Sequence, residues 1–327
     1  MKTLLRSAII GAGLTLAATT ASLAVEIQVG HTLTTDSHYQ AAALKFKEVV
    51  EAGSKGAITV NIFPQSQLGG EVKMIQSART GAIAAFITAA PPLENTVQEY
   101  SILSLPYLFD DLDQANTVMQ GPFGEQMLKQ LDSRGLVGLT FLSSFERSVF
   151  GSRAIRKVED FKGMKIRVLQ GPGFIRTYEA LGAQPTPMAY SEVFVALQNG
   201  VVDGAEADPA QVVQDKFVEV TKFFNFTKIH YMPSLLVFSK ARFDALTKEQ
   251  QELVRSAAKQ AAKASLEAYK KTYAEGVEGM KKAKVELIYP DLAPFKQVAR
   301  GVWPSLLTAV PNGDALLKDA QAALKTK

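Results

Sequence analysis

The 327-residue sequence contains no cysteine, three histidines and one tryptophan. Without cysteine the fold cannot depend on disulfides, so a hydrophobic core must supply its stability. Three histidines, none four residues from another, leave little material for a zinc site. We therefore expect neither a metal nor a cofactor.

Long hydrophobic runs are scarce as well. The apolar run at residues 8–19 is shorter than the roughly 20 residues of a membrane-spanning helix. Lys2 and Arg6 precede it, and residues 21–24, Ala-Ser-Leu-Ala, carry small side chains where a signal peptidase cleaves. This pattern predicts a signal peptide over residues 1–24 and a soluble protein exported to the periplasm.

Neither charge sign is in strong excess. The formal charge is +4, from 36 basic and 32 acidic residues, and the signal peptide supplies two of these charges through Lys2 and Arg6. Such a balance gives no support for nucleic-acid binding. The mature length of about 300 residues suggests two lobes rather than one.

Motifs of common enzyme families are absent too. There is no Gly-x-Ser-x-Gly elbow and no P-loop. Gly171-Pro-Gly173 lacks the third glycine of a dinucleotide fingerprint. Glu206 and Asp208 would share one face of a strand, but two carboxylates are weak support for acid-base catalysis. We expect no catalytic residues and no enzymatic activity.

The sequence does show an alternation of strand and helix patterns, with short links, from residue 25 onward. Strands are predicted at residues 25–31, 57–63 and 83–88, and helices at 38–52 and 71–79. This predicts mixed sheets flanked by helices. His31 and Glu71 fall where strand and helix ends face a cleft, which makes them candidate ligand contacts, although turn or capping roles are commoner there.

Thr247 and Gln250 form a capping box, which begins a helical pattern reaching about residue 284. A helix of that length extends about 54 Å, longer than one small lobe, so we expect it to span both lobes. A coiled coil is the alternative, but the apolar positions are mostly alanine and no heptad is sustained. Gly276 and Gly279 are expected to loosen its end.

Residues 164–170, Met-Lys-Ile-Arg-Val-Leu-Gln, predict a short strand with Ile166 and Val168 on one face and Arg167 on the other. Gly171-Pro-Gly173 follows as a predicted turn. An arginine at the carboxyl end of a strand is well placed to bind an anion between two lobes, and Gln170 lies at the same end. A solvated position on the sheet is the alternative for Arg167.

Five further stretches stand out by their order along the chain: residues 105–109 (Leu-Pro-Tyr-Leu-Phe), 161–168 (Phe-Lys-Gly-Met-Lys-Ile-Arg-Val), 181–188 (Leu-Gly-Ala-Gln-Pro-Thr-Pro-Met), 190–193 (Tyr-Ser-Glu-Val) and 196–204 (Ala-Leu-Gln-Asn-Gly-Val-Val-Asp-Gly). In this order they resemble the DctP-type solute-binding proteins of tripartite ATP-independent periplasmic (TRAP) transporters. Each block alone is modestly specific, but the ordered set is strong and covers essentially the whole mature chain.

The resemblance implies an α/β, two-lobed, periplasmic-binding-protein-like fold. We expect lobe I to comprise residues 25–145 with 234–272, and lobe II residues 146–233 with 273–327. The lobes would close on a small organic acid and deliver it to a small and a large membrane subunit of the transporter. The receptor itself is expected to be a monomer.

The resemblance also assigns site residues. Arg167 would form a paired contact with the ligand carboxylate, Arg147 would be a second arginine at the ligand, and Tyr190 would pack on its carbon skeleton. Phe145 and Tyr231 complete the candidate contacts. In the rival role, Arg167 would hold the lobes together through Glu206 or Asp208.

One departure from the family bears on specificity. Members with a sialic-acid-like ligand carry asparagine where this chain has Ala207, and Asp208 follows at once. An ionised aspartate accepts hydrogen bonds, so Asp208 and Glu206 would suit ligand hydroxyls or an amine. We therefore expect a hydroxylated or sugar-acid carboxylate. The alternatives are a sulfonate, a plain dicarboxylate, or a periplasmic enzyme acting on an organic acid.

Overall fold

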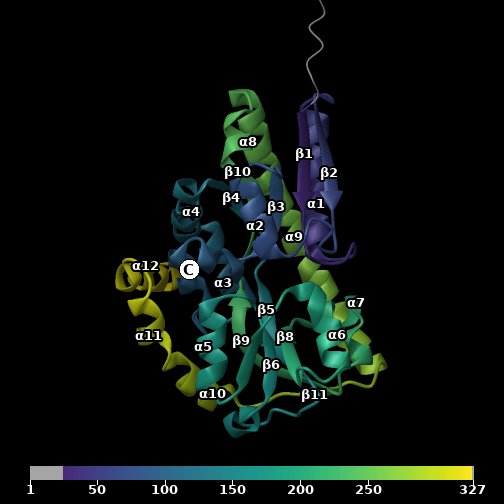
Figure 1. Cartoon of the computed structure of the whole chain (residues 1–327), viewed down its shortest axis with the longest axis vertical. Coiled ribbons are helices and arrows are strands. Elements are labelled where there is room, and N and C mark those ends of the chain that lie inside the picture. Colours follow the sequence, from purple (N-terminus) through teal and green to yellow (C-terminus); the bar gives the residue numbers. More distant parts are fainter. Residues whose placement is uncertain (1–24, 326–327) are drawn as a thin grey trace, which may run out of the picture.

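Two β-sheets flanked by helices follow one another along the long axis of the molecule (Figure 1). The computed structural model describes residues 25–325, and the predicted signal peptide lies outside this range. The predicted mixed α/β architecture is confirmed. Within residues 25–325 no helix combines the length and the apolar character that crossing a membrane requires.

The first sheet has the strand order β2-β1-β3-β10-β4. β1 is parallel to β2 and β3, whereas β10 is antiparallel to β3 and β4. In β1 the alternation predicted from the sequence is present, because Ile27 and Val29 are buried while Glu26 is exposed. The strands are β1 (Val25–Gly30), β2 (Ile58–Phe63), β3 (Ala85–Ala89), β4 (Leu136–Phe141) and β10 (Ser234–Ser239).

Most of the helices around this sheet connect its strands. Ser37 caps the first of them, since its hydroxyl accepts a hydrogen bond from the amide of Gln40. They are α1 (His38–Gly53), α2 (Glu71–Arg79), α3 (Leu112–Gln120), α4 (Pro122–Lys129) and α8 (Lys240–Asp244), with the 3₁₀ helices η1 (Pro91–Asn95), η2 (Gln98–Ser104) and η3 (Asp132–Arg134).

The second sheet has the order β11-β9-β5-β8-β6-β7. Its strands are β5 (Phe145–Gly151), β6 (Lys165–Val168), β7 (Gln184–Pro187), β8 (Gly204–Ala207), β9 (Phe223–Met232) and β11 (Glu286–Ile288). β6 is parallel to both β7 and β8, so its carboxyl end shares one edge of the sheet with theirs. The helices are α5 (Pro172–Ala180), α6 (Val193–Gln198), α7 (Pro209–Gln214) and α10 (Leu292–Arg300), with η4 (Val158–Phe161), η5 (Tyr190–Glu192) and η6 (Phe217–Glu219).

The predicted long helix is confirmed as α9 (Lys248–Lys282), which begins at the capping box of Thr247 and Gln250. It packs on α1 beside the first sheet and on α7 beside the second, and so joins the two lobes (Figure 1). Gly276 does not loosen it, because this glycine lies against α7. A Cβ atom there would lie 2.4 Å from the carbonyl carbon of Pro209.

The chain also passes between the sheets at residues 142–144 and at Pro233. The last two helices, α11 (Trp303–Thr308) and α12 (Gly313–Lys325), contact η2, and α12 also contacts α3 and α4. Residues 303–325, which the sequence-based division assigned to lobe II, therefore pack on elements around the first sheet.

Candidate functional site

Arg167 lies on β6, and only 3% of its surface is exposed. Its Nε and Nη2 atoms both donate to the carbonyl oxygen of Met188, at 3.2 and 2.9 Å, and its guanidinium carbon lies 5.7 Å from the ring centroid of Tyr190. One edge of the planar fork is thus fixed by the backbone. Among the described residues Nη1 forms no hydrogen bond, and a free guanidinium edge of this kind suits an anion.

Arg147, on β5, is equally buried. Its Nη1 donates to Oε1 of Gln211 at 2.8 Å, and its Nη2 donates to the backbone carbonyl of Glu206. Among the described residues, no hydrogen-bond partner faces its Nε atom. A buried cation with an unpaired donor is costly unless an anion compensates it.

Both arginines border a small cavity between the lobes, about 20 Å³ in volume, which is room for roughly one water molecule. A larger ligand therefore requires the lobes to separate before it enters. The first sheet and its helices contribute Thr32, Leu33, Tyr39, Glu71 and Ala89, and the rest of the wall is Phe145, Arg147, Arg167, Leu169, Tyr190, Gln211 and Met232.

Glu71 stands opposite the arginines at the start of α2. Its Oε1 accepts from the amide of Ala89 at 2.8 Å and from the hydroxyl of Thr88 at 3.1 Å. Burial raises the pKa of Glu71, while these two donors and the arginines oppose that rise. Burial also raises the pKa of Tyr39 well above its usual value, so its hydroxyl stays protonated. The cavity wall thus contains both a hydrogen-bond acceptor, the Glu71 carboxyl, and a hydrogen-bond donor, the Tyr39 hydroxyl.

Arg167 keeps its charge at neutral pH. Burial, followed by repulsion from Arg147, lowers the pKa of Arg167 to about 10. Two guanidinium groups against the single carboxyl of Glu71 give the cavity wall an excess of positive charge. Such a wall suits a small organic acid, whose carboxylate accepts paired hydrogen bonds.

Five of the residues predicted from the sequence therefore lie together around the cavity: Arg167, Arg147, Tyr190, Glu71 and Phe145. The Tyr190 hydroxyl donates to Oδ2 of Asp215 at 2.6 Å, which fixes the ring beside Arg167.

Glu206 and Asp208 lie behind the cavity wall instead of lining it. Oε1 of Glu206 is 3.2 Å from Nδ1 of His230. Burial alone would raise the pKa of Glu206, but His230, Arg147 and Tyr178 together lower it. Asp208 is the N-cap of α7, where its Oδ1 accepts from the amide of Gln211 at 3.0 Å. It thereby orients the helix that carries Gln211, the partner of Arg147.

Three more predicted residues do not border the cavity: His31, Gln170 and Tyr231. Nε2 of His31 is 2.8 Å from Oε1 of Gln40, and burial lowers its pKa to about 4. The carbonyl of Gln170 accepts from Nδ2 of Asn95. Tyr231 borders a separate surface hollow near α3 and α9.

Sequence reasoning missed several wall residues, Tyr39 and Gln211 among them. Tyr39 is the second residue of the helix predicted at residues 38–52, and its residue type alone does not signal a ligand contact. Gln211 could have been found, because it stands three residues after Asp208 and completes a capping box with it. Among residues 25–325, no group of three or more His, Asp or Glu side chains is arranged to hold a metal ion.

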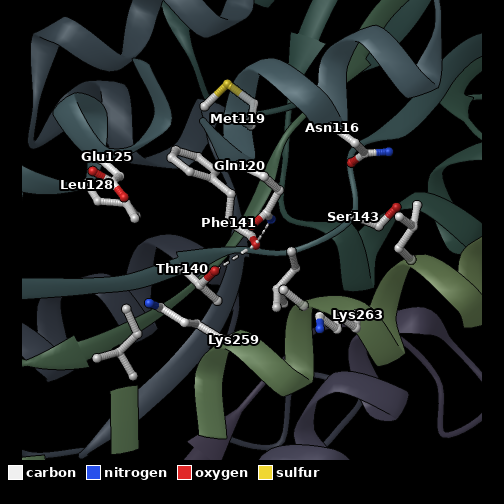
Figure 2. Close-up of a pocket in the computed structure, with 14 residues that line it drawn as sticks. Asn116, Met119, Gln120, Glu125, Leu128, Thr140, Phe141, Ser143, Lys259 and Lys263 are labelled. Carbon is white, nitrogen blue, oxygen red and sulfur yellow. Dashed lines mark hydrogen bonds between the residues drawn. The ribbon is translucent and has the colours of Figure 1, made fainter. Parts of the chain in front are cut away.

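A roomier hollow of about 480 Å³ lies between α3, α4, β4 and α9 (Figure 2). Gln120 and Thr140 donate there to the carbonyl of Phe141, and the nearby cations are Lys259 and Lys263. Both lysines are exposed, and none of the predicted site residues borders this hollow. Exposed lysines are strongly hydrated and screened by salt, whereas a buried guanidinium fork matches the geometry of a carboxylate.

A cavity between two lobes, lined by buried guanidinium groups, defines a two-lobed receptor for a small organic anion. Residues 29–308 match the family model described as bacterial extracellular solute-binding protein, family 7 (DctP). The chain belongs to this family, whose members include periplasmic solute-binding proteins of TRAP transporters.

Relatives and solved structures agree with this assignment. The 2,3-diketo-L-gulonate-binding periplasmic protein of Escherichia coli is 32% identical over 94% of each chain. A TRAP periplasmic solute-binding protein from Xanthobacter autotrophicus, with bound β-D-galacturonate, superposes with a TM-score of 0.87 at 31% identity, covering 90% of this chain and 99% of its own. One from Polaromonas, bound to D-erythronate, gives a TM-score of 0.89 at 30% identity over 93% and 100% of the two chains.

Proposed function

We propose that this protein is the extracytoplasmic receptor of a TRAP transporter and binds a hydroxylated or sugar-acid carboxylate by lobe closure. The observation that carries the proposal is the pair of buried guanidinium groups, Arg147 and Arg167, at a cavity walled by both lobes. A ligand that contacts both walls stabilises the closed arrangement, since only there does it make all its contacts.

The ligand class follows from the polar groups opposite the arginines. Glu71 accepts hydrogen bonds and the protonated Tyr39 hydroxyl can donate them, so the cavity suits hydroxyl groups as well as a carboxylate. The similar proteins described as binding diketogulonate, galacturonate or erythronate support the same class. A plain alkyl dicarboxylate would leave Glu71 without a donor from the ligand.

The proposal also covers targeting, assembly and delivery of the ligand. The receptor reaches the periplasm through its signal peptide, acts there as a monomer without catalytic residues, and delivers its ligand to a small and a large membrane subunit. One lobe comprises residues 25–145 with 234–272, and the other comprises residues 146–233 with 273–327. Within the second lobe, residues 303–325 pack on elements around the first sheet.

Native mass spectrometry of the freshly purified protein tests the ligand class. We expect a co-purified small acid, and we expect sugar acids added to the emptied protein to raise its melting temperature. If only unsubstituted dicarboxylates or sulfonates stabilise the protein, the proposed class is wrong. If the bound acid is converted to a product on incubation, the protein is an enzyme.

A further inference from the structure

Glu94 is a buried carboxylate that the ligand cavity does not use. It lies on η1, after β3 of the first sheet, and 2% of its surface is exposed. Its oxygens accept from the hydroxyls of Ser104 and Ser101, which belong to the adjacent η2. Its third donor is different, because the amide of Gly173, 3.1 Å from Oε2, belongs to α5 beside the second sheet.

That contact completes a helix end that has no cap of its own. The N-cap residue of α5 is Gly171, which has no side chain, and Pro172 follows at the first helical position. Free amides at a helix start are stabilised by an acceptor and by negative charge. Glu94 supplies the acceptor from 79 residues away in the sequence, and it supplies the negative charge as well when it is ionised. The predicted Gly-Pro-Gly turn is thus the start of α5.

The same loop is packed too closely for side chains. A Cβ atom on Gly171 would lie 2.7 Å from Oε1 of Glu94, and one on Gly173 would lie 2.5 Å from Cβ of Ser104. Next to Glu94, Nδ2 of Asn95 donates to the carbonyl of Gln170 at 2.8 Å. Two consecutive residues of η1 therefore hold the loop at residues 170–173.

This loop directly follows the strand that carries Arg167. Leu169, between Arg167 and the loop, borders the ligand cavity. At the other end of the loop, Phe174 stacks on His230 with ring centroids 4.1 Å apart, and His230 contacts Glu206. A shift of the loop therefore displaces the immediate surroundings of both arginines.

We propose that Glu94 is a positioning residue for ligand binding: its hydrogen bond to the α5 terminus ties the first lobe to the loop after Arg167 and stabilises the closed arrangement. It touches no ligand and acts through the loop. The inference rests on the proposed function, because the closed arrangement is the one that retains the ligand. A hydrogen bond present only in the closed state slows its opening, so its loss acts mainly on ligand release.

The test compares Glu94→Gln with Glu99→Gln, a matched change at a half-buried residue of η2 whose side chain forms no hydrogen bond with α5 among the described residues. Glutamine keeps the shape of Glu94 and one acceptor but loses the charge, so the comparison is made at about pH 8.5, well above the Glu94 pKa of about 7. With D-galacturonate as the probe, we expect Glu94→Gln to raise the dissociation constant roughly tenfold, mostly through faster release, and Glu99→Gln to leave it unchanged. The melting temperature of the ligand-free protein should be similar for both variants, which separates positioning from loss of structure.

A second readout needs no ligand. The chain has no cysteine, so Leu44→Cys on α1 and Val195→Cys on α6 give unique sites for spin labels on the two lobes, at positions 50% and 55% exposed. We expect Glu94→Gln to shift the interlobe distances toward longer values. Identical distances in parent and variant, or an unchanged dissociation constant where the parent binds, overturn the inference. If the parent binds no sugar acid, the proposed function is wrong, and the distances alone decide the role of Glu94.

Discussion

Two arginines dominate the chemistry at the residue scale, and each is fixed before a ligand arrives. Met188 holds one edge of Arg167, while Gln211 and Glu206 hold Arg147. A guanidinium that is already oriented loses little conformational freedom on binding, so more of the contact energy appears as affinity. Tyr190 adds a ring beside Arg167 that an apolar ligand face can contact.

Arg167→Lys should weaken binding without unfolding the protein. Lysine keeps the charge but lacks the planar fork, so one of two paired contacts is lost. We expect the dissociation constant for the bound acid to rise about 10- to 100-fold, which corresponds to about 1.5–3 kcal/mol. Isothermal titration calorimetry measures it, with the exposed Arg134→Lys as the control. Unchanged affinity in the Arg167 variant would remove this residue from the site.

Residue types alone predicted some of this site. Arg167 could be predicted because a short strand that ends in glycine and proline places its side chain at a sheet edge, and the family resemblance added Arg147 and Tyr190. Asp208 could not be assigned in the same way. An aspartate after a strand and before Pro209 is as good a helix cap as a ligand contact, and the sequence does not say which role prevails.

At the element scale, Asp208 stabilises the start of α7 as its N-cap. Burial raises the pKa of Asp208 to about 7, so a neutral side chain is tolerated there. We expect Asp208→Asn to keep the cap, the stability and the ligand affinity. Asp208→Ala should lose about 1 kcal/mol of unfolding free energy. Urea denaturation and calorimetry on both variants make the comparison. An asparagine variant that is stable but binds ten times more weakly would show that Asp208 contacts the ligand.

The end of α9 depends on close packing against α7. A Cβ atom at Gly276 would lie 2.4 Å from the backbone of Pro209, so Gly276→Ala forces the helices apart. We expect it to lower the unfolding free energy by about 1–3 kcal/mol in urea denaturation. Glu275→Ala, the next position and exposed, introduces the same residue and should stay within about 0.5 kcal/mol of the parent. Equal stability of the two variants would contradict this packing role.

The elements themselves were largely predictable, because α9 and the β1–α1–β2 unit have strong periodicity and clear caps. The start of α5 was missed because Gly-Pro-Gly usually forms a turn, and its actual cap comes from Glu94, far away in the sequence. The role of Gly276 was missed for a similar reason. Helix propensity treats an interior glycine as a weakness, whereas tertiary contact with α7 requires it.

At the scale of the whole molecule, stability depends on pH through buried groups with opposite effects. Burial, and then repulsion from His31, lowers the pKa of His38 to about 3, so the folded protein keeps this ring neutral. The unfolded chain protonates it below about pH 6.5. Its stability contribution is therefore present above pH 6.5 and is lost as pH falls. Burial raises the pKa of Glu94 to about 7. Protonation of this carboxyl therefore stabilises the folded state below pH 7, and this contribution is lost as the pH rises, which is opposite to the effect of His38.

Replacing His38 separates its contribution to pH-dependent stability from that of Glu94. His38→Phe keeps an aromatic ring among Tyr39, Phe145 and Tyr269 but cannot be protonated. From pH 7.5 to pH 5.0, the unfolding free energy of the variant relative to the parent should rise by about 2 kcal/mol. Urea denaturation at the two pH values measures it. A difference that does not change with pH would mean that His38 is not held neutral in the folded state.

Lobe closure on a hydroxylated acid is the central claim, and isothermal titration calorimetry of the emptied protein tests it most directly. D-galacturonate, D-glucuronate and D-erythronate are titrated beside succinate, in one buffer at neutral pH. We expect saturable binding of one molecule per chain for at least one of the three hydroxylated acids, and none for succinate. Binding of succinate with no response to the three hydroxylated acids would contradict the claim.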